Sequence, residues 1–350
     1  MEAVFKKYDL IFKRPSGTSR GILKKKETWF LILNNHGKLG IGECGLFRGL
    51  SVDDIPEYED KLSWTCSHIH FGKDRLLEDL KEYPSIAFGV EQAFISLQSE
   101  DPFLLFPSNF TKSTAEIEIN GLIWMGKKEY MQEQINQKID SGFSCIKIKI
   151  GAIDFNEELS LLTSLRKIYT KEEIEIRVDA NGAFKEEEAL DKLIKLAACE
   201  IHSIEQPIKQ GFPVKMKNIC KKSPLPVALD EELIGIFTAK EKENLLKTIM
   251  PHYIILKPSL IGGFKESEEW IDIAEKLNIG WWITSALESN IGLNAIAQWT
   301  YTLKNKMPQG LGTGSLFTNN FDSPLKIKNG KLLYDKHSNW EQNLINKLCT

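Results

Sequence analysis

Five successive strand-like segments in the middle of the sequence each carry charge near their carboxyl end. The segments read CIKIKIG, IEIRVDAN, HSIEQP, PVALDE and YIILKP. The first carries two lysines, the next three carry one acid each, and the fifth carries a lysine: Lys147, Lys149, Asp179, Glu205, Asp230 and Lys257. One such charge can simply cap the following helix, but five in register predict a common site.

Three carboxylates on adjacent strands would face one another across a small cavity. Their mutual repulsion requires a cation or protonation. Oxygen ligands suit a hard ion such as Mg²⁺ better than zinc, and Mg²⁺ keeps coordination positions open for water and substrate. The sequence therefore predicts a Mg²⁺ site, with Mn²⁺ as an alternative.

The lysines flank the acidic segments in chain order. Lys149 precedes them and Lys257 follows them, so a closed barrel would place the two on opposite sides of a cavity. The predicted chemistry is removal of the proton beside a carboxylate, because a divalent ion stabilises the enediolate that forms. A lysine acts as the base once burial, a second lysine and the metal lower its pKa. We predict that Lys147 lowers the pKa of Lys149 or neutralises the substrate carboxylate.

From about residue 116 the sequence alternates strand-like and helix-like segments. Eight strand-like segments recur at intervals of 25–30 residues, marked by Asn120, Lys149, Asp179, Glu205, Asp230, Lys257, Ser285 and Thr313. The segments between them place apolar residues every three or four positions, which is typical of helices. We predict an α/β fold with a (β/α)7β TIM-like barrel. A doubly wound open sheet is the alternative, disfavoured because no G-x-G-x-x-G follows a first strand.

The remaining segments predict a second unit. Residues 1–115 contain hairpin-like segments followed by helical runs, which indicates an N-terminal α+β capping domain. The catalytic barrel is assigned to residues 116–319. Residues 320–350 read as a short hairpin and are predicted to return to the capping domain and complete it.

Composition and charge exclude several classes of function. The 350-residue chain has a formal net charge of −3, so its bulk charge indicates neither a nucleic acid nor an anionic membrane as partner. No apolar run approaches the ~20 residues of a spanning helix, no signal peptide is visible, and the six cysteines form no C-x-x-C pair. We expect a cytoplasmic enzyme that binds a small-molecule carboxylate substrate. The sequence carries no information on its oligomeric state.

The charged set resembles that of a known family. The lysine pair of IKIKIG, the Asp of RVDANGAF, the Glu of SIEQPI, the Asp of ALDEEL and the Lys of ILKPSLIGG are similar to those of the enolase superfamily, in its muconate-lactonizing-enzyme-like group. Within that group, INGLIWMG, TSALESNIGL and GLGTG resemble the o-succinylbenzoate synthase family. The resemblance covers nearly the whole chain. It implies a capping domain, a barrel, and Mg²⁺-dependent dehydration of a cyclohexadiene carboxylate to 2-succinylbenzoate in menaquinone biosynthesis.

The resemblance also implies a role for each charged residue. It makes Asp179, Glu205 and Asp230 the metal ligands; the family pattern places the third ligand on the first acid of its run. Lys149 is implied as the acid/base that removes the α-proton and assists departure of the hydroxyl on the same face. Lys257, opposite, is implied to stabilise the enolate by its charge, and in relatives that epimerise the equivalent lysine is the second acid/base.

Substrate contacts are implied by the same resemblance. They are Lys147, Asn181, Ser285, Gly312 and Thr313. The capping-domain loops Pro15–Leu23 and Gly45–Ser51 are expected to close over the substrate. Either Arg20 or Arg48 would meet a substrate carboxylate there, or each is a plain surface charge.

Three alternative functions stay open at this point. A dipeptide epimerase or N-acylamino-acid racemase would keep the site, but epimerases of this type carry Asp-x-Asp after the eighth strand, where this chain has Gly312-Thr313-Gly314. A barrel scaffold with a structural ion cluster would show no turnover. A Schiff-base aldolase would need one isolated, desolvated lysine and has no use for three converging carboxylates.

Overall fold

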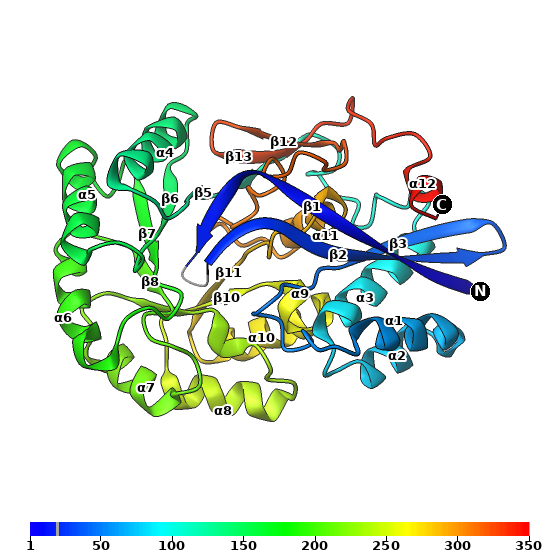
Figure 1. Cartoon of the computed structure of the whole chain (residues 1–350), viewed down its shortest axis with the longest axis horizontal. Coiled ribbons are helices and arrows are strands. Elements are labelled where there is room, and N and C mark those ends of the chain that lie inside the picture. Colours follow the sequence, from blue (N-terminus) through cyan, green and yellow to red (C-terminus); the bar gives the residue numbers. More distant parts are fainter. Residues whose placement is uncertain (19–20, 350) are drawn as a thin grey trace.

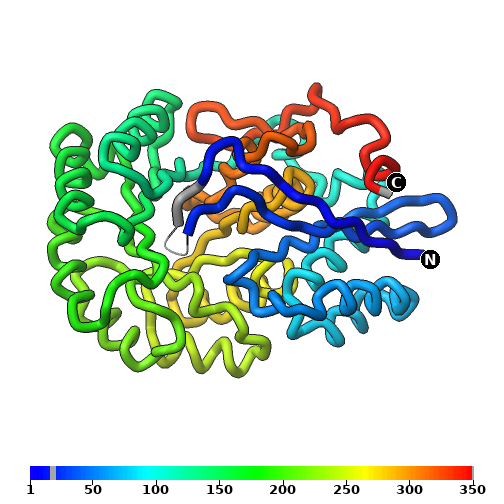
Figure 2. Tube along the Cα trace, in the orientation of Figure 1, coloured from blue at the N-terminus to red at the C-terminus, as the bar shows by residue number. Residues whose placement is uncertain are grey.

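The computed structural model describes residues 1–18 and 21–349 of the chain. Its larger part is a ring of parallel strands surrounded by helices, and its smaller part is an antiparallel sheet with helices beside it (Figure 1). The chain starts in the smaller part, forms the ring and returns, so that both ends lie on the same side of the molecule (Figure 2). No helix in the described ranges has both the length and the apolar character needed to span a bilayer.

Alternating apolar residues produce the antiparallel sheet of the smaller part. Its strands lie in the order β1 (Glu2–Thr18), β2 (Gly21–Asn35) and β3 (Lys38–Cys44). In the β2–β3 turn, His36 and Gly37 have positive φ angles of 52° and 88°, and the Gly37 amide donates a hydrogen bond of 2.9 Å to the Asn34 side chain. This turn fixes the register, and alternate residues of β2 enter two different apolar clusters.

Helices pack closely on that sheet. They are α1 (Tyr58–Ser67), η1 (Ile69–Phe71), α2 (Lys73–Asp79) and α3 (Pro84–Gln98). A Cβ atom on Gly42 of β3 would lie 1.9 Å from the Gly89 carbonyl oxygen of α3, so the close approach requires glycine. The same helix reaches the barrel, because Glu91 accepts hydrogen bonds from the backbone amides of Phe264 (2.6 Å) and Lys265 (3.2 Å).

Seven short parallel strands form most of the barrel wall. They lie in the order β5 (Gly121–Ile123), β6 (Cys145–Lys149), β7 (Glu175–Asp179), β8 (Ser203–Glu205), β9 (Val227–Leu229), β10 (Tyr253–Leu256) and β11 (Gly280–Ile283). The helical elements between and after them are α4 (Lys128–Asp140), α5 (Phe155–Ile168), α6 (Glu186–Ala197), α7 (Pro213–Lys222), η2 (Glu231–Leu233), α8 (Ala239–Ile249), α9 (Pro258–Ile261), α10 (Phe264–Lys276) and α11 (Asn290–Thr302). Apolar residues of the strands and helices form one continuous core, which confirms the predicted α/β barrel.

A short eighth segment closes the ring. Gln309 pairs with Ile119 on one side and Gly310 pairs with Thr284 on the other, both in parallel bridges. The Asn120 amide donates to the Gln309 carbonyl at 2.9 Å, and the Gly310 amide donates to the carbonyl of Ile283, at the end of β11, at 2.8 Å. The eighth strand expected near Thr313 is therefore a bridging segment that ends a few residues earlier.

The EIEING segment, expected to be one barrel strand, is divided between two sheets. Its β4 (Ile117–Glu118) pairs with the C-terminal hairpin of β12 (Leu325–Lys328) and β13 (Lys331–Tyr334), and the barrel strand β5 starts at Gly121. After the hairpin, α12 (Leu344–Cys349) places apolar residues in a cluster with Phe30 and Ile32 of β2. The boundaries predicted at 1–115, 116–319 and 320–350 stay a prediction.

The β1–β2 hairpin reaches across one end of the barrel (Figure 1). Leu10 and Phe12 of β1 pack in one apolar cluster with Trp124 and Leu287, which follow barrel strands β5 and β11. At the other end, Arg177 of β7 is 1% exposed, and its guanidinium lies 4.2 Å from the centre of the Trp282 ring. The barrel interior is therefore filled on one side and covered by the hairpin on the other.

Candidate active site

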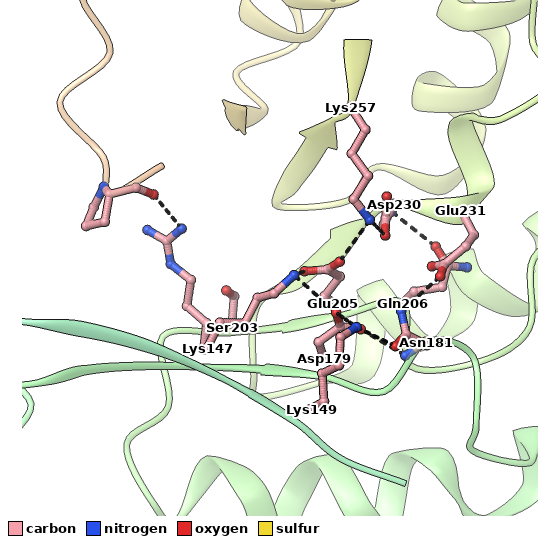
Figure 3. Close-up of polar contacts among 12 residues, drawn as sticks. Lys147, Lys149, Asp179, Asn181, Ser203, Glu205, Gln206, Asp230, Glu231 and Lys257 are labelled. Atoms are coloured by element: carbon pink, nitrogen blue, oxygen red, sulfur yellow. Dashed lines mark hydrogen bonds and ion pairs between the residues drawn. The ribbon is translucent and has the colours of Figure 1, made fainter. Parts of the chain in front are cut away.

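The predicted charged residues meet inside the barrel, near the carboxyl ends of its strands (Figure 3). Strand register aligns Lys149 of β6 with Asp179 of β7, and Asp179 with Glu205 of β8. Neighbours in register on parallel strands point the same way, so the three side chains share the interior face. Asp230 follows β9 and Lys257 follows β10, which continues the row.

Ammonium groups lie between the carboxylates. Lys147 Nζ lies 3.1 Å from Asp179 Oδ2 and 2.8 Å from Glu205 Oε2. Lys149 Nζ lies 3.0 Å from Asp179 Oδ2. Lys257 Nζ lies 3.8 Å from Glu205 Oε1 and forms a short ion pair with Asp230 Oδ2. We call these six residues, three acids and three lysines, the acidic wall.

The environment shifts the pKa values of these groups in opposite directions. Burial lowers the pKa of Lys147, but the Glu205 and Asp179 carboxylates outweigh burial and hold that pKa above its usual range. Burial raises the pKa of Asp179, but Lys149 and Lys147 outweigh it and the pKa is lowered. For Glu205, burial and the neighbouring Asp179 together raise the pKa well above its usual value despite Lys147.

Lysine and aspartate also pair at the far edge of the row. Burial lowers the pKa of Lys257, but Asp230 and Glu205 outweigh it and raise that pKa. Burial raises the pKa of Asp230, but Lys257 outweighs it and lowers that pKa. Both residues of this pair are therefore held in their charged forms.

The donor set fits a divalent cation. Glu205 Oε1 is buried and has no hydrogen-bond partner among the described residues, and burial with the neighbouring Asp179 raises the pKa of this carboxyl. Within those residues no three carboxylate, imidazole or thiol groups stand together as a ready ligand set, because ammonium groups separate the acids. A cation bound by Asp179, Glu205 and Asp230 would take over charge pairing that the lysines now provide.

Asn181 connects Lys149 to a fourth acid. Its Oδ1 accepts a 2.7 Å hydrogen bond from Lys149 Nζ, and its Nδ2 donates to Glu231 Oε1 at 2.9 Å. Its backbone amide donates to Asp179 Oδ1 at 3.0 Å, in a turn where Asn181 has a φ angle of 44°. The predicted substrate contact thus also positions Lys149.

Sequence reasoning missed Gln206. This buried residue has a φ angle of 40°; its Nε2 donates to Glu232 Oε2 at 3.0 Å, and its Oε1 accepts from the Asp230 amide at 3.2 Å. It therefore holds the segment that presents Asp230. The adjacent glutamine in SIEQPI was a visible signal, although nothing in the pattern showed its partners.

A pocket of about 710 Å³, its open mouth included, lies beside the lysines. Its lining residues are Phe47, Leu50, Asn120, Leu122, Trp124, Lys147, Lys149, Asn181, Lys257, Leu260, Thr284, Ser285, Ala286, Leu287, Gly310, Gly312 and Thr313. All the predicted lysines and substrate contacts are in this set, whereas the three acids lie behind the lysines. Across the ring from the acids, the lining is uncharged: Asn120, Thr284, Ser285, Gly310, Gly312 and Thr313, which we call the neutral wall.

A hydroxyl relay runs through the neutral wall. Thr313 Oγ1 donates to Ser285 Oγ at 2.8 Å, and Ser285 Oγ donates to Glu288 Oε2 at 2.5 Å. Ser259 Oγ donates to the other Glu288 oxygen at 2.5 Å. Glu288 is fully buried. Sequence reasoning quoted it in TSALESNIGL but gave it no role.

The capping-domain loops meet the barrel in different ways. Phe47 and Leu50 of the Gly45–Ser51 loop line the pocket, which agrees with the predicted position of that loop. Arg48 does not line it; its guanidinium pairs with Glu27 at 2.7 Å and Asp54 at 2.6 Å. Arg20, in the other predicted loop, lies outside the described residues.

Comparison with known proteins gives consistent results. A family model described as Enolase C-terminal domain-like matches residues 130–336. The o-succinylbenzoate synthase of Desulfotalea psychrophila (strain LSv54 / DSM 12343) is 44% identical to this chain, over 95% of this chain and 98% of the relative. The crystal structure of MenC from Desulfotalea psychrophila LSv54 is similar with a TM-score of 0.85 and 40% identity, covering 95% of this chain and 99% of that one.

A more distant structure shares the fold. The substrate-liganded complex of the L-Ala-D/L-Glu epimerase from Bacillus subtilis has a TM-score of 0.81 at 18% identity, covering 95% of this chain and 96% of that one. At this identity the likeness concerns the fold alone.

Proposed function

The chain belongs to the enolase superfamily, in its muconate-lactonizing-enzyme-like group, and from that membership and its site we propose an o-succinylbenzoate synthase function. The enzyme is a carbon–oxygen lyase that dehydrates 2-succinyl-6-hydroxy-2,4-cyclohexadiene-1-carboxylate to 2-succinylbenzoate, a step in menaquinone biosynthesis. The observation that carries this proposal is near-full-length similarity to a synthase of that name.

Enzymes of this superfamily use a divalent metal. We propose that Asp179, Glu205 and Asp230 hold it and that it is Mg²⁺, with Mn²⁺ as the alternative ion. When bound, the ion supplies positive charge to the substrate carboxylate as negative charge develops there. Supporting this proposal are the burial of all three carboxylates and the Glu205 Oε1 atom, which has no hydrogen-bond partner among the described residues.

We propose that Lys149 is the acid/base. As a neutral amine it takes the proton from C1 of the ring, and the resulting ammonium gives that proton to the hydroxyl leaving from C6 on the same face. Water is released, the ring becomes aromatic, and Lys149 returns to its starting state. Its hydrogen bond to Asn181 Oδ1 directs the Nζ atom, because the amide oxygen accepts one ammonium proton.

The other two lysines are proposed to act through charge. Lys147 lines the pocket beside Asp179 and Glu205 and is proposed to neutralise the substrate carboxylate with its positive charge. Lys257 follows β10, on the other side of the acids from Lys149, and is proposed to stabilise the enolate by its positive charge. Apolar lining by Phe47, Leu50 and neighbours excludes water from the reacting carbon.

A direct assay tests the proposed function. Purified protein with Mg²⁺ is expected to dehydrate the cyclohexadiene substrate, EDTA is expected to stop turnover, and excess Mg²⁺ or Mn²⁺ is expected to restore it. The alternative function, a dipeptide epimerase or N-acylamino-acid racemase, would also use lysines on two sides of the substrate but would give another product. Rapid racemisation of an N-acylamino acid or epimerisation of a dipeptide, with no dehydration, would contradict the proposal.

The cytoplasmic location stays part of the proposal and is checked by fractionation.

A further inference from the structure

The neutral wall contains two buried polar side chains without partners. Asn120, just before β5, is 4% exposed, and Thr284, just after β11, is 8% exposed. Asn120 Oδ1 and Thr284 Oγ1 have no hydrogen-bond partner in the part of the chain that the structure describes, and both residues line the pocket. Buried amides and hydroxyls are normally hydrogen-bonded, because leaving them unsatisfied is destabilising. The Thr284 hydroxyl can therefore donate to a ligand in the pocket, whereas Asn120 Oδ1 can only accept and the donor that the Asn120 side chain offers is its Nδ2.

These two side chains flank a single glycine. Gly310 pairs with Thr284 on one side, and its neighbour Gln309 pairs with Ile119, the residue before Asn120, on the other. A Cβ atom on Gly310 would lie 2.4 Å from Thr284 Oγ1, so the hydroxyl leans over the position that a side chain would fill. Adjacent strands lie about 4.8 Å apart. One ligand group above Gly310 is thus within reach of both side chains.

The hydroxyls predicted to contact substrate are already engaged as donors. Ser285 gives its proton to Glu288, and Thr313 gives its proton to Ser285. A hydroxyl has one proton to donate. Ser285 Oγ also accepts from the Leu287 amide at 3.1 Å, so both of its lone pairs are engaged as well. Among the described neutral-wall side chains, the donors left for a ligand are the Thr284 hydroxyl and the Asn120 Nδ2.

The charge of this wall indicates what it binds. The lysines that line the pocket stand with the acids, and the neutral wall contributes only uncharged residues to the described lining. A buried carboxylate without a cation is strongly disfavoured, whereas a ketone oxygen needs only hydrogen-bond donors. The proposed substrate carries such a ketone where its succinyl arm joins the ring.

We propose that Asn120 and Thr284 donate hydrogen bonds to the ketone oxygen of the succinyl arm and so select substrates with a carbonyl at that position. This inference rests on the proposed function, because that function supplies the ligand. It gives a ligand-binding role to two residues that lie in the motifs INGLIWMG and TSALESNIGL but to which sequence reasoning assigned no role.

Binding of two probes tests the subsite in the presence of Mg²⁺. The probes are the product 2-succinylbenzoate and 2-(3-carboxypropyl)benzoate, in which a methylene replaces the ketone. Calorimetry is expected to show that the natural protein prefers the ketone by about tenfold. Thr284→Val and Asn120→Leu are each expected to reduce this preference at least threefold, with less than a twofold change for the methylene probe. Thr302→Val, which removes an exposed threonine hydroxyl on α11, is the control and should change neither affinity.

Stability of the ligand-free protein gives an independent reading. Because both substitutions remove a buried unsatisfied polar group, each is expected to raise the melting temperature by about 1–3 °C while it weakens ketone binding. The subsite would be overturned if the variants bind both probes equally more weakly or keep the ketone preference unchanged. It would also be overturned if the natural protein shows no preference for the ketone probe. Dehydration is measured separately: its absence overturns the proposed function, and persistent turnover with unchanged preference in the variants overturns only the subsite.

Discussion

The acidic wall and the neutral wall face each other across one pocket, and they differ in how their polar groups are satisfied. In the acidic wall, carboxylates and ammonium groups mainly pair with one another, as Lys147 does with Asp179 and Glu205. In the neutral wall, Asn120 and Thr284 each have a buried oxygen without a hydrogen-bond partner among the described residues. The difference indicates that one wall is organised before substrate arrives, whereas the other is completed by substrate. Predictions follow from the largest expected effect to the smallest.

Removing the proposed base, Lys149, from the acidic wall should abolish turnover. Lys149→Ala is expected to lower kcat by at least about 10³-fold, because general acid–base catalysis contributes on that scale. Lys195→Ala on the exposed face of α6 is the matched control. Steady-state kinetics and circular dichroism provide the measurements. Retained activity in a folded Lys149→Ala protein would show that another group is the base.

A buried acid without a lysine partner sharpens the contrast with the acidic wall. Burial raises the pKa of Glu91 from 4.5 to about 7 despite the amides of Phe264 and Lys265, whereas lysines lower that of Asp179. The folded protein thus binds the Glu91 proton more tightly than the unfolded chain does. Stability from this group is fully present below pH 4.5 and is lost as pH rises toward 7, by about 3 kcal/mol.

Denaturant unfolding of the natural protein and Glu91→Gln at several pH values checks this sign. Between pH 4.5 and 7 the unfolding free energy of the natural protein should fall by about 3 kcal/mol relative to that of Glu91→Gln. A constant difference, or a natural protein that gains stability with pH relative to Glu91→Gln, would contradict it.

Removing the acceptor behind the neutral wall tests the hydroxyl relay. Glu288→Ala leaves Ser259 and Ser285 without their acceptor, and it is expected to lower the unfolding free energy by about 3 kcal/mol. Because the Ser285 hydroxyl then regains a free proton beside the pocket, KM is expected to change more than kcat. The measurements are thermal unfolding and kinetics, with exposed Glu187→Ala as the control. A kcat loss as large as that of Lys149→Ala would place Glu288 in the chemistry itself.

The smallest effect is expected at the capping-domain surface. Arg48 pairs with Glu27 and Asp54 while its side chain is 46% exposed, and such pairs contribute about 1 kcal/mol or less. Arg48→Ala should therefore change KM less than about twofold. A tenfold rise in KM would show that Arg48 contacts a substrate carboxylate and is more than a surface charge.

The two walls also differ in how far sequence alone could predict them. Lys147, Asp179 and Lys257 stood out because a charge inside an apolar strand is costly unless a site compensates it. Asn120 and Thr284 gave no such signal, since neutral polar residues at strand ends are common and their missing partners exist only in three dimensions. Ser285, predicted as a substrate contact, lines the pocket. Its proton is donated to Glu288, whose orientation no motif encodes.

Fold prediction shows the same limit. Periodic strands and helices were enough to predict the barrel, because each unit repeats the same local pattern. The segment around Ile117 and Gly121 was not resolved by pattern, because a run of alternating residues can pair on either edge, and the C-terminal hairpin occupies part of it. Pairing with the C-terminal hairpin, and not local preference, determines which part of this segment joins the barrel.

The Mg²⁺ dependence of dehydration tests the division into two walls most directly. Initial rates are measured against Mg²⁺ concentration for the natural protein, for Asp179→Asn, and for Thr284→Val. The account predicts that Asp179→Asn raises the Mg²⁺ concentration for half-maximal rate at least tenfold, whereas Thr284→Val leaves it unchanged and raises the KM for substrate. A Thr284→Val protein with altered Mg²⁺ dependence, or an Asp179→Asn protein with normal dependence, would contradict the account.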